Sequence, residues 1–182
     1  MTTPTRRARK LVAAFIREFG WDVSPARRTV EYWSPDAAIP QLHCRKAGRT
    51  PQLVAVVFKT EPWEYGVANQ LRHGIGKDLW QGYHNAEQSA GLPVWLFIHE
   101  GKSGALLRAR RSELVVAQEL AAADSNGAYD EDMVFFARDE FDVLTTDAGE
   151  TGQQHLVVEE VDSAFGEDDE PGGQSSLVGF GG

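Results

Sequence analysis

Residues 53–63 read LVAVVFKTEPW, and the predicted fold is built around them. The run from Leu53 to Phe58 is apolar and rich in β-branched residues, which is typical of a strand buried on both faces. Lys59 ends the run, and a buried ammonium group needs a partner because removing a charge from water costs free energy. Either Lys59 belongs to a functional site or its ammonium group reaches water at the end of the strand.

The segments on either side of this strand predict an α/β domain. Residues 6–19 place apolar side chains on one helical face, and Gly20 is a typical residue at the end of a helix. The expected order of helix, strands, helix and strand gives an α-β-β-β-α-β sandwich with a mixed central sheet. We expect strands near 28–33, 37–45, 52–59, 94–100 and 105–108, an edge strand at 133–138, and helices at 66–90 and at 112–123, the last capped by Ser112.

The composition divides the chain at residue 147. Residues 1–146 form the predicted α/β domain, and residues 147–182 form an acidic, Gly-rich tail that we expect to be mostly disordered. The tail ends in apolar residues after a run of acids, so docking to a protein partner stays open beside the simpler interpretation of a disordered tail.

Charge is distributed unevenly along the chain. Residues 1–111 hold 17 of the 18 Lys and Arg but 9 of the 27 acidic residues, a balance of +8. The remaining residues carry a balance of −17. A basic first half favours a polyanionic partner such as DNA. The single cysteine, Cys44, excludes an internal disulfide, and no apolar run is long enough to span a bilayer. We therefore expect a cytoplasmic protein.

Two short motifs carry a resemblance to a known family. They are Ser34-Pro35-Asp36 and Val57-Phe58-Lys59, with Asp36 and Val57 21 positions apart, as a strand hairpin would place them. With the surrounding helices and strands, residues 6–110 resemble the PD-(D/E)xK nuclease superfamily. Among its branches the chain is most similar to Holliday-junction-resolvase-like enzymes, common in archaea and phages. The resemblance implies a restriction-endonuclease-like fold.

The resemblance also implies a metal-dependent DNA phosphodiesterase. Asp36 would bind Mg²⁺ or Mn²⁺, and Lys59 would assist the attacking water and stabilise negative charge. The chain departs from the family at Val57, where the family has an acid. Glu61 is the first candidate to replace that carboxylate as a catalytic residue and metal ligand, with Glu64 or Glu31 as further candidates. Taken alone, Asp36 is also a common kind of turn residue.

Two interpretations therefore stay open from the sequence. One is an active nuclease or resolvase-like enzyme. The other is an inactive nuclease-fold module that binds nucleic acid or a protein, or a structural component of a larger assembly. The resemblance leaves open whether the chain forms a homodimer. Predicted contacts to the phosphate backbone are Arg27, Arg28, Arg45, Lys46, Arg49 and Lys77. Trp33 and Trp63 flank the proposed site and either stack on bases or belong to the core.

Overall fold

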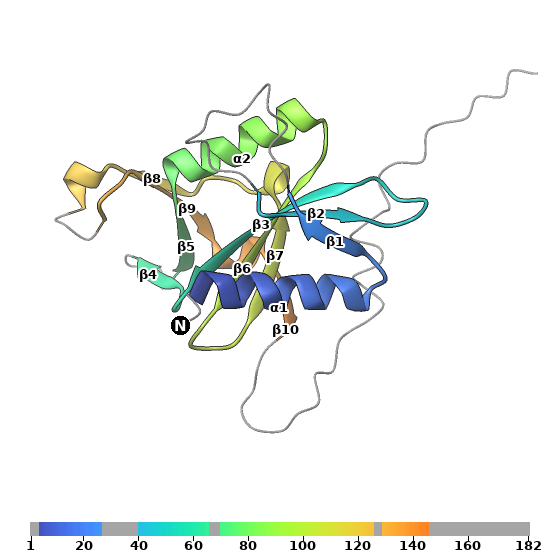
Figure 1. The fold of residues 1–182 in the computed structure, drawn as a ribbon. Coiled ribbons are helices and arrows are strands. Elements are labelled where there is room, and N and C mark those ends of the chain that lie inside the picture. The colour runs from blue at the N-terminus through green and yellow to red at the C-terminus, as the bar shows by residue number, and fades with distance from the viewer. Residues whose placement is uncertain (1–3, 27–39, 66–69, 126–128, 146–182) are drawn as a thin grey trace, which may run out of the picture.

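The computed structural model of the chain describes residues 4–26, 40–65, 70–125 and 129–145. These residues form two α-helices, α1 (Pro4–Glu18) and α2 (Lys77–Ala90), and two sheets (Figure 1). The six-stranded sheet has the order β1 (Asp22–Pro25), β2 (Leu42–Arg45), β3 (Gln52–Lys59), β6 (Val94–Glu100), β7 (Leu106–Arg110) and β10 (Asp142–Thr145). The four-stranded sheet has the order β4 (Trp63–Tyr65), β5 (Gln70–Gly76), β9 (Met133–Ala137) and β8 (Gln118–Leu120).

The larger sheet is mixed, which confirms the predicted α/β class. Strands β3 and β6 run parallel, and the other neighbouring pairs in this sheet are antiparallel. A parallel pair needs a crossover connection, and helix α2 lies in the segment that joins β3 to β6. The β4–β5 hairpin lies in the same connection and is an addition that the sequence did not predict.

Both faces of the larger sheet are buried, as the apolar run of β3 predicts. Val54 and Val56 pack in one core with α1, whereas Leu53 and Ala55 pack in a second core with α2, β5 and β9. Side chains alternate along a strand, so Val57 and Lys59 share the face of the second core. Val57 packs against that second core.

Helix α1 is amphipathic, and its direction places its basic end near Lys59. Val12 and Ile16 are buried, and the helix ends before Gly20, which has a φ of 76°. A short turn leads into β1, which is antiparallel to β2, as β2 is to β3. The N-terminal turn of α1 therefore lies at the carboxyl end of β3 (Figure 1).

The predicted helix over 66–90 is wrong in its first half. Strand β5 pairs with β4 and β9, and α2 begins only at Lys77. Gly74 and Gly76 disfavour a helix here, and the pairing buries His73 and Ile75. The helical pattern that starts at Lys77 was correct, and α2 ends at Gly91 in a left-handed conformation.

The predicted helix over 112–123 is also wrong. This segment forms the 3-10 turns η1 (Arg111–Glu113) and η2 (Ala122–Asp124) with β8 between them. Residues 118–120 pair with β9, and the Ala117 N–H donates to the Phe135 carbonyl at 2.8 Å. Tertiary pairing has overridden a favourable local helix propensity. Ser112 lies within η1 and does not begin an α-helix.

The strand predicted at the sheet edge, residues 133–138, is a central strand. Strand β9 lies between β5 and β8, and η3 (Arg138–Glu140) follows it. The prediction failed because neither partner strand had been recognised. The strand expected near 28–33 and the acidic tail from residue 147 lie outside the described residues. None of the described helices has the length and apolar character needed to cross a membrane.

Candidate nucleic-acid interface

Lys59 ends β3 beside the end of β6. The two parallel strands are in register, so Lys59 lies opposite Glu100. The pairing continues into the β6–β7 turn, where the Gly101 N–H donates to the Lys59 carbonyl at 2.7 Å. Burial lowers the pKa of the Lys59 ammonium group, and the negative charge of Glu131 partly opposes this shift. Ligands in α/β proteins bind at the carboxyl ends of parallel strands, and Lys59 stands at that end.

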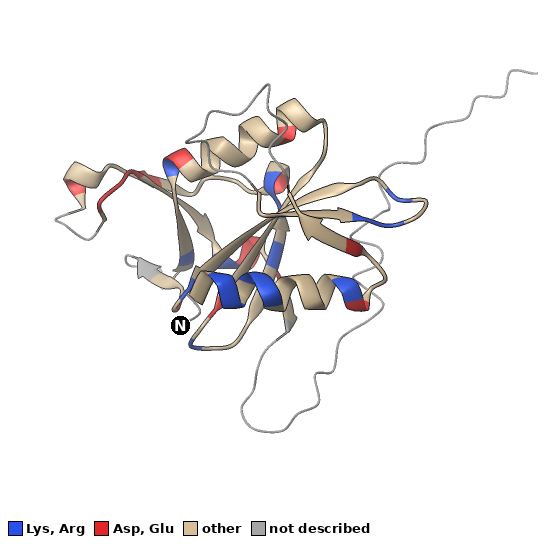
Figure 2. Ribbon diagram, viewed as in Figure 1, with Lys and Arg blue, Asp and Glu red and all other residues tan. Residues whose placement is uncertain are grey.

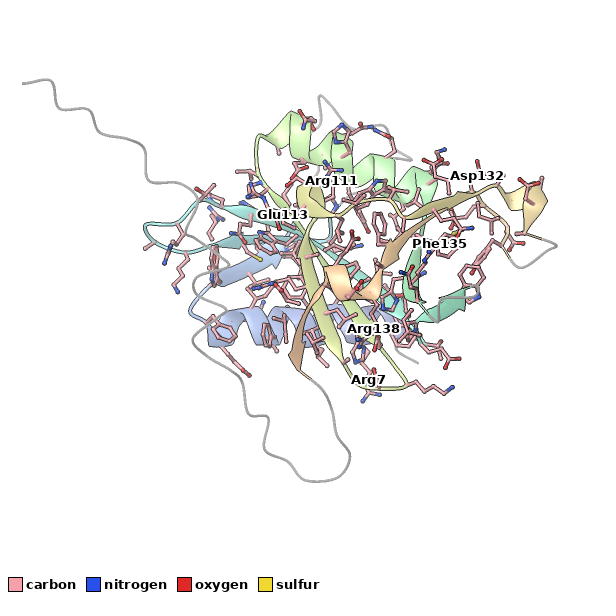
Figure 3. All side chains as sticks on the ribbon, turned by 180° about the vertical axis from the view of Figure 1, so that it is seen from behind. Arg7, Arg111, Glu113, Asp132, Phe135 and Arg138 are labelled. Carbon is pink, nitrogen blue, oxygen red and sulfur yellow. The ribbon has the colours of Figure 1, made fainter. Side chains whose placement is uncertain are left out.

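Glu100 is buried in a polar cluster that holds the two sheets together. Its carboxylate accepts hydrogen bonds from His73 Nε2 at 2.8 Å, from Arg138 Nε at 2.7 Å and from Ser103 Oγ at 2.6 Å. His73 comes from β5 and Arg138 from η3, so three separate parts of the chain meet on one carboxylate. Figure 3 labels Arg138 beyond the end of β9.

The protonation states of this cluster follow from its geometry. Burial raises the pKa of Glu100, but hydrogen bonds from Arg138, Ser103 and His73 outweigh that effect and bring the pKa down to about 2. Glu100 is therefore ionised and can only accept hydrogen bonds. His73 Nε2 must donate to it. Burial lowers the pKa of His73, so the ring is neutral and its Nδ1 is an acceptor.

A pocket of about 650 Å³ opens beside Lys59, between the end of β3 and the smaller sheet. Its lining includes the basic side chains Lys59 and Arg72, the imidazole of His73, and the aromatic rings Trp63, Tyr129 and Phe135. Arg72 is held on β5 by its hydrogen bond to Gln118, at 2.8 Å. The pocket thus combines positive charge with aromatic surface.

The structure brings together two of the three predicted catalytic residues. Lys59 and Glu61 line the same pocket. The Glu61 carboxylate, however, pairs with the Lys102 ammonium at 2.5 Å, and both side chains are exposed. Strand β3 ends at Lys59, so the continuing strand that would place Glu61 on the same face does not form. Asp36 lies outside the described residues.

The described residues do not fit a magnesium site. No group of three or more His, Cys, Asp and Glu side chains in the described part of the chain could hold a metal ion. Val57 has no ligand atom, and Glu100 already accepts hydrogen bonds from three neighbouring side chains.

The predicted phosphate contacts fall in several places. Arg45, Lys46 and Arg49 lie at the β2–β3 turn, at the opposite end of β3 from Lys59, about 23 Å away at the rise of an extended strand. Lys77 begins α2, and its ammonium group bonds Glu119 at 2.6 Å, which raises the Lys77 pKa. Arg27 and Arg28 lie outside the described residues.

A second set of cations lies at the same end as Lys59. The first two turns of α1 expose Arg6, Arg7, Arg9 and Lys10, and the first turn contains no acid. Positive side chains at a helix N-terminus oppose the helix dipole, at a cost of about 0.3–1 kcal/mol each. Figure 2 shows this basic stretch of α1, and Figure 3 labels Arg7 in it. Lys102 follows the end of β6 in the neighbouring turn.

Sequence reasoning missed Glu100, His73 and Arg138. The signal for Glu100 was present, because LVAVVFK and VWLFIHE are both apolar runs that end in a charged residue. Parallel neighbours in register bring such ends together. His73 was assigned to a helix, and Arg138 carried no local pattern. Trp21 and Trp95 are buried in the core.

Comparisons with known proteins give a likeness of structure. No family model matches the chain, and no curated protein matches it. The chain is similar in structure to Hjc of Archaeoglobus fulgidus, a Holliday junction resolvase from an archaeal hyperthermophile, with a TM-score of 0.49 and 10% sequence identity. The match covers 76% of this chain and 87% of the other.

Proposed function

We propose that this chain is a nucleic-acid-binding α/β domain that holds a phosphate backbone at the carboxyl end of β3 and β6. One observation carries the proposal: cations from separate elements lie at this end of the molecule. Lys59 and Arg72 line one pocket, and the basic turns of α1 lie at the same end of the sheet. We call this set of residues (Arg6, Arg7, Arg9, Lys10, Lys59 and Arg72) the basic end.

Two features of the basic end disfavour positive charge. The first turn of α1 has no acidic residue, and burial of Lys59 lowers its pKa. Phosphates would relieve both unfavourable features, because they neutralise the cations and favour the charged form of lysine. Phosphate contacts of this kind give affinity that depends on salt and not on sequence. DNA is the expected polyanion.

Binding of a labelled DNA strand at increasing salt concentration tests this proposal. We expect log K to fall linearly with log of the salt concentration, with a slope of about −0.7 for each neutralised phosphate on a single strand. Affinity that does not change with salt would contradict it.

A metal-dependent phosphodiesterase is the second candidate. The observation that favours it is Lys59, half-buried in a pocket with Glu61 beside it. It would need Asp36 as a ligand for Mg²⁺ or Mn²⁺, together with a further carboxylate. Incubation with linear and branched DNA, with and without the metals, tests it directly. Cleavage that requires metal and is lost in both Asp36→Ala and Lys59→Ala would establish it, and absence of cleavage beside intact binding would favour the binding module.

The remaining expectations are also proposals. They are a homodimer and a protein partner for the acidic tail. Arg45, Lys46 and Arg49 lie far enough from Lys59 to be tested separately from the basic end.

A further inference from the structure

We infer that the pocket beside Lys59 holds one unstacked nucleobase together with its phosphate. The inference deepens the proposed nucleic-acid binding and rests on it. Phosphate contacts alone would need only an open basic surface. This pocket instead presents aromatic side chains next to its cations, and that combination suits a group that is planar and aromatic at one end and anionic at the other.

Aromatic rings form one wall of the pocket. The Trp63 ring lies 5.0 Å from the Phe135 ring and 6.3 Å from the Tyr129 ring, measured between centroids. Trp63 and Tyr129 are half-buried and Phe135 is buried, so the wall has a fixed base and an accessible rim. Every nucleobase has a π-face, and stacking on an aromatic side chain is the common way in which proteins hold unpaired bases.

Gly74 allows this wall to form. It lies opposite Phe135 in the β5–β9 ladder, and a Cβ atom at Gly74 would come within 2.6 Å of the Phe135 ring. The ring therefore lies across the backbone of β5, where any larger residue would push it away. Figure 3 labels Phe135 on β9, the strand that carries this part of the wall.

Polar groups in the pocket match the other parts of a nucleotide. Lys59 provides a positive charge for the phosphate. His73 lines the pocket, and its Nδ1 is buried without a hydrogen-bond partner in the described part of the chain. The His73 ring is only 1% exposed, so it forms part of the buried lining of the pocket. The pocket volume of about 650 Å³ is within the range of about 300–1,000 Å³ that is usual for small-ligand sites.

A strand without bases separates this inference from phosphate binding. Two single strands of equal length are compared by fluorescence anisotropy, one with ordinary bases and one with abasic sites throughout. We expect the ordinary strand to bind about 5- to 150-fold more tightly, from the usual contribution of one stacked base. The Trp63→Leu variant should lose most of that difference. The control variant Phe19→Leu, which changes a half-buried ring packed against Phe15 on α1, should keep it.

The outcomes distinguish the two proposals. Equal, salt-dependent affinity for both strands would overturn the base pocket and leave the phosphate proposal standing. If neither strand binds, the phosphate proposal fails, and a free nucleoside monophosphate tests the pocket alone. If the nucleotide binds the wild type but not Trp63→Leu, the pocket takes its base from a free nucleotide. If the nucleotide does not bind the wild type, the inference is overturned. Tyr129→Leu tests the same wall if Trp63→Leu does not fold.

Discussion

Lys59 and Glu100 occupy the same register position on two parallel strands, and they have different roles. The Glu100 carboxylate is bonded by His73 and Arg138, which join the smaller sheet to the larger one. Lys59 instead lines the pocket. One of the two charged strand ends therefore stabilises the fold, and we propose that the other meets a ligand.

Glu100→Ala should strongly destabilise the protein. Removing the carboxylate leaves the Arg138 charge and the buried His73 N–H without their partner, and loss of one member of a buried pair costs about 3–5 kcal/mol. Urea unfolding measures this loss. The control is Glu61→Ala, which removes an exposed ion pair with Lys102 and should change stability by about 1 kcal/mol or less. Equal effects of the two substitutions would contradict the structural role of Glu100.

Stability should fall with acid in two stages. The pKa of His73 in the folded protein lies below its ordinary value of 6.5 because the ring is buried, so the unfolded chain binds more protons below pH 6.5. The stability that the neutral His73 ring contributes is therefore present above pH 6.5 and decreases as the pH falls. Glu100, with a folded pKa of about 2 against an ordinary 4.5, contributes stability above pH 4.5 that is lost between about pH 4.5 and 2.

Urea unfolding at pH 7, 6 and 5 tests the first stage. The His73→Gln variant should lose much of the pH dependence in this range, whatever its stability at pH 7. The control His84→Gln, at a half-buried position on α2, should retain it. A wild-type protein whose stability rises as the pH falls from 7 to 5 would contradict the neutral state of the His73 ring.

Lys59→Met should weaken DNA binding and stabilise the protein. Burial disfavours the charged ammonium group, so a neutral side chain of similar length removes an unfavourable charge. We expect a gain of up to about 1 kcal/mol in the free energy of unfolding. Loss of one phosphate contact should lower the magnitude of the salt slope for a single strand by about 0.7. Reduced stability beside unchanged DNA affinity would show that Lys59 is a structural residue.

Gly74→Ala should disturb the pocket wall. The new methyl group would clash with the Phe135 ring, and such overpacking costs about 1–3 kcal/mol. Gly76→Ala is the matched control, because the nearest atoms there belong to the flexible end of Glu131, which can move away. Thermal unfolding of the two variants measures the difference. A smaller loss in Gly74→Ala than in Gly76→Ala would contradict the packing described for β5 and β9.

The sequence predicted the central part of the fold because local pattern and tertiary role agree there. The apolar runs ending in Lys59 and Glu100 form β3 and β6, and α1 has the expected amphipathic face. Residues 70–76 and 118–120 were assigned to helices but form strands. Their strand conformation depends on pairing with β9, which no local pattern reveals.

The candidate site was predictable only on β3. Lys59 stood out because a lysine ends an apolar strand. The partners of Glu100 could not be predicted, since His73 and Arg138 are 27 and 38 positions away and reach it only after the two sheets pack. The basic cluster at Arg45, Lys46 and Arg49 was predictable, because the expected strands 37–45 and 52–59 place it at their junction, at the opposite end of β3 from Lys59.

Nucleic-acid binding at the basic end underlies the other proposals for this chain. The most direct test measures the salt dependence of DNA affinity for three proteins: the wild type, a basic-end variant (Arg7→Gln, Lys10→Gln, Lys59→Gln) and a β2–β3 turn variant (Arg45→Gln, Lys46→Gln, Arg49→Gln). Each variant loses three positive charges, so net charge is matched between them. We predict a lower affinity and a shallower salt slope for the basic-end variant, with the turn variant close to wild type. A loss confined to the turn variant would contradict the account.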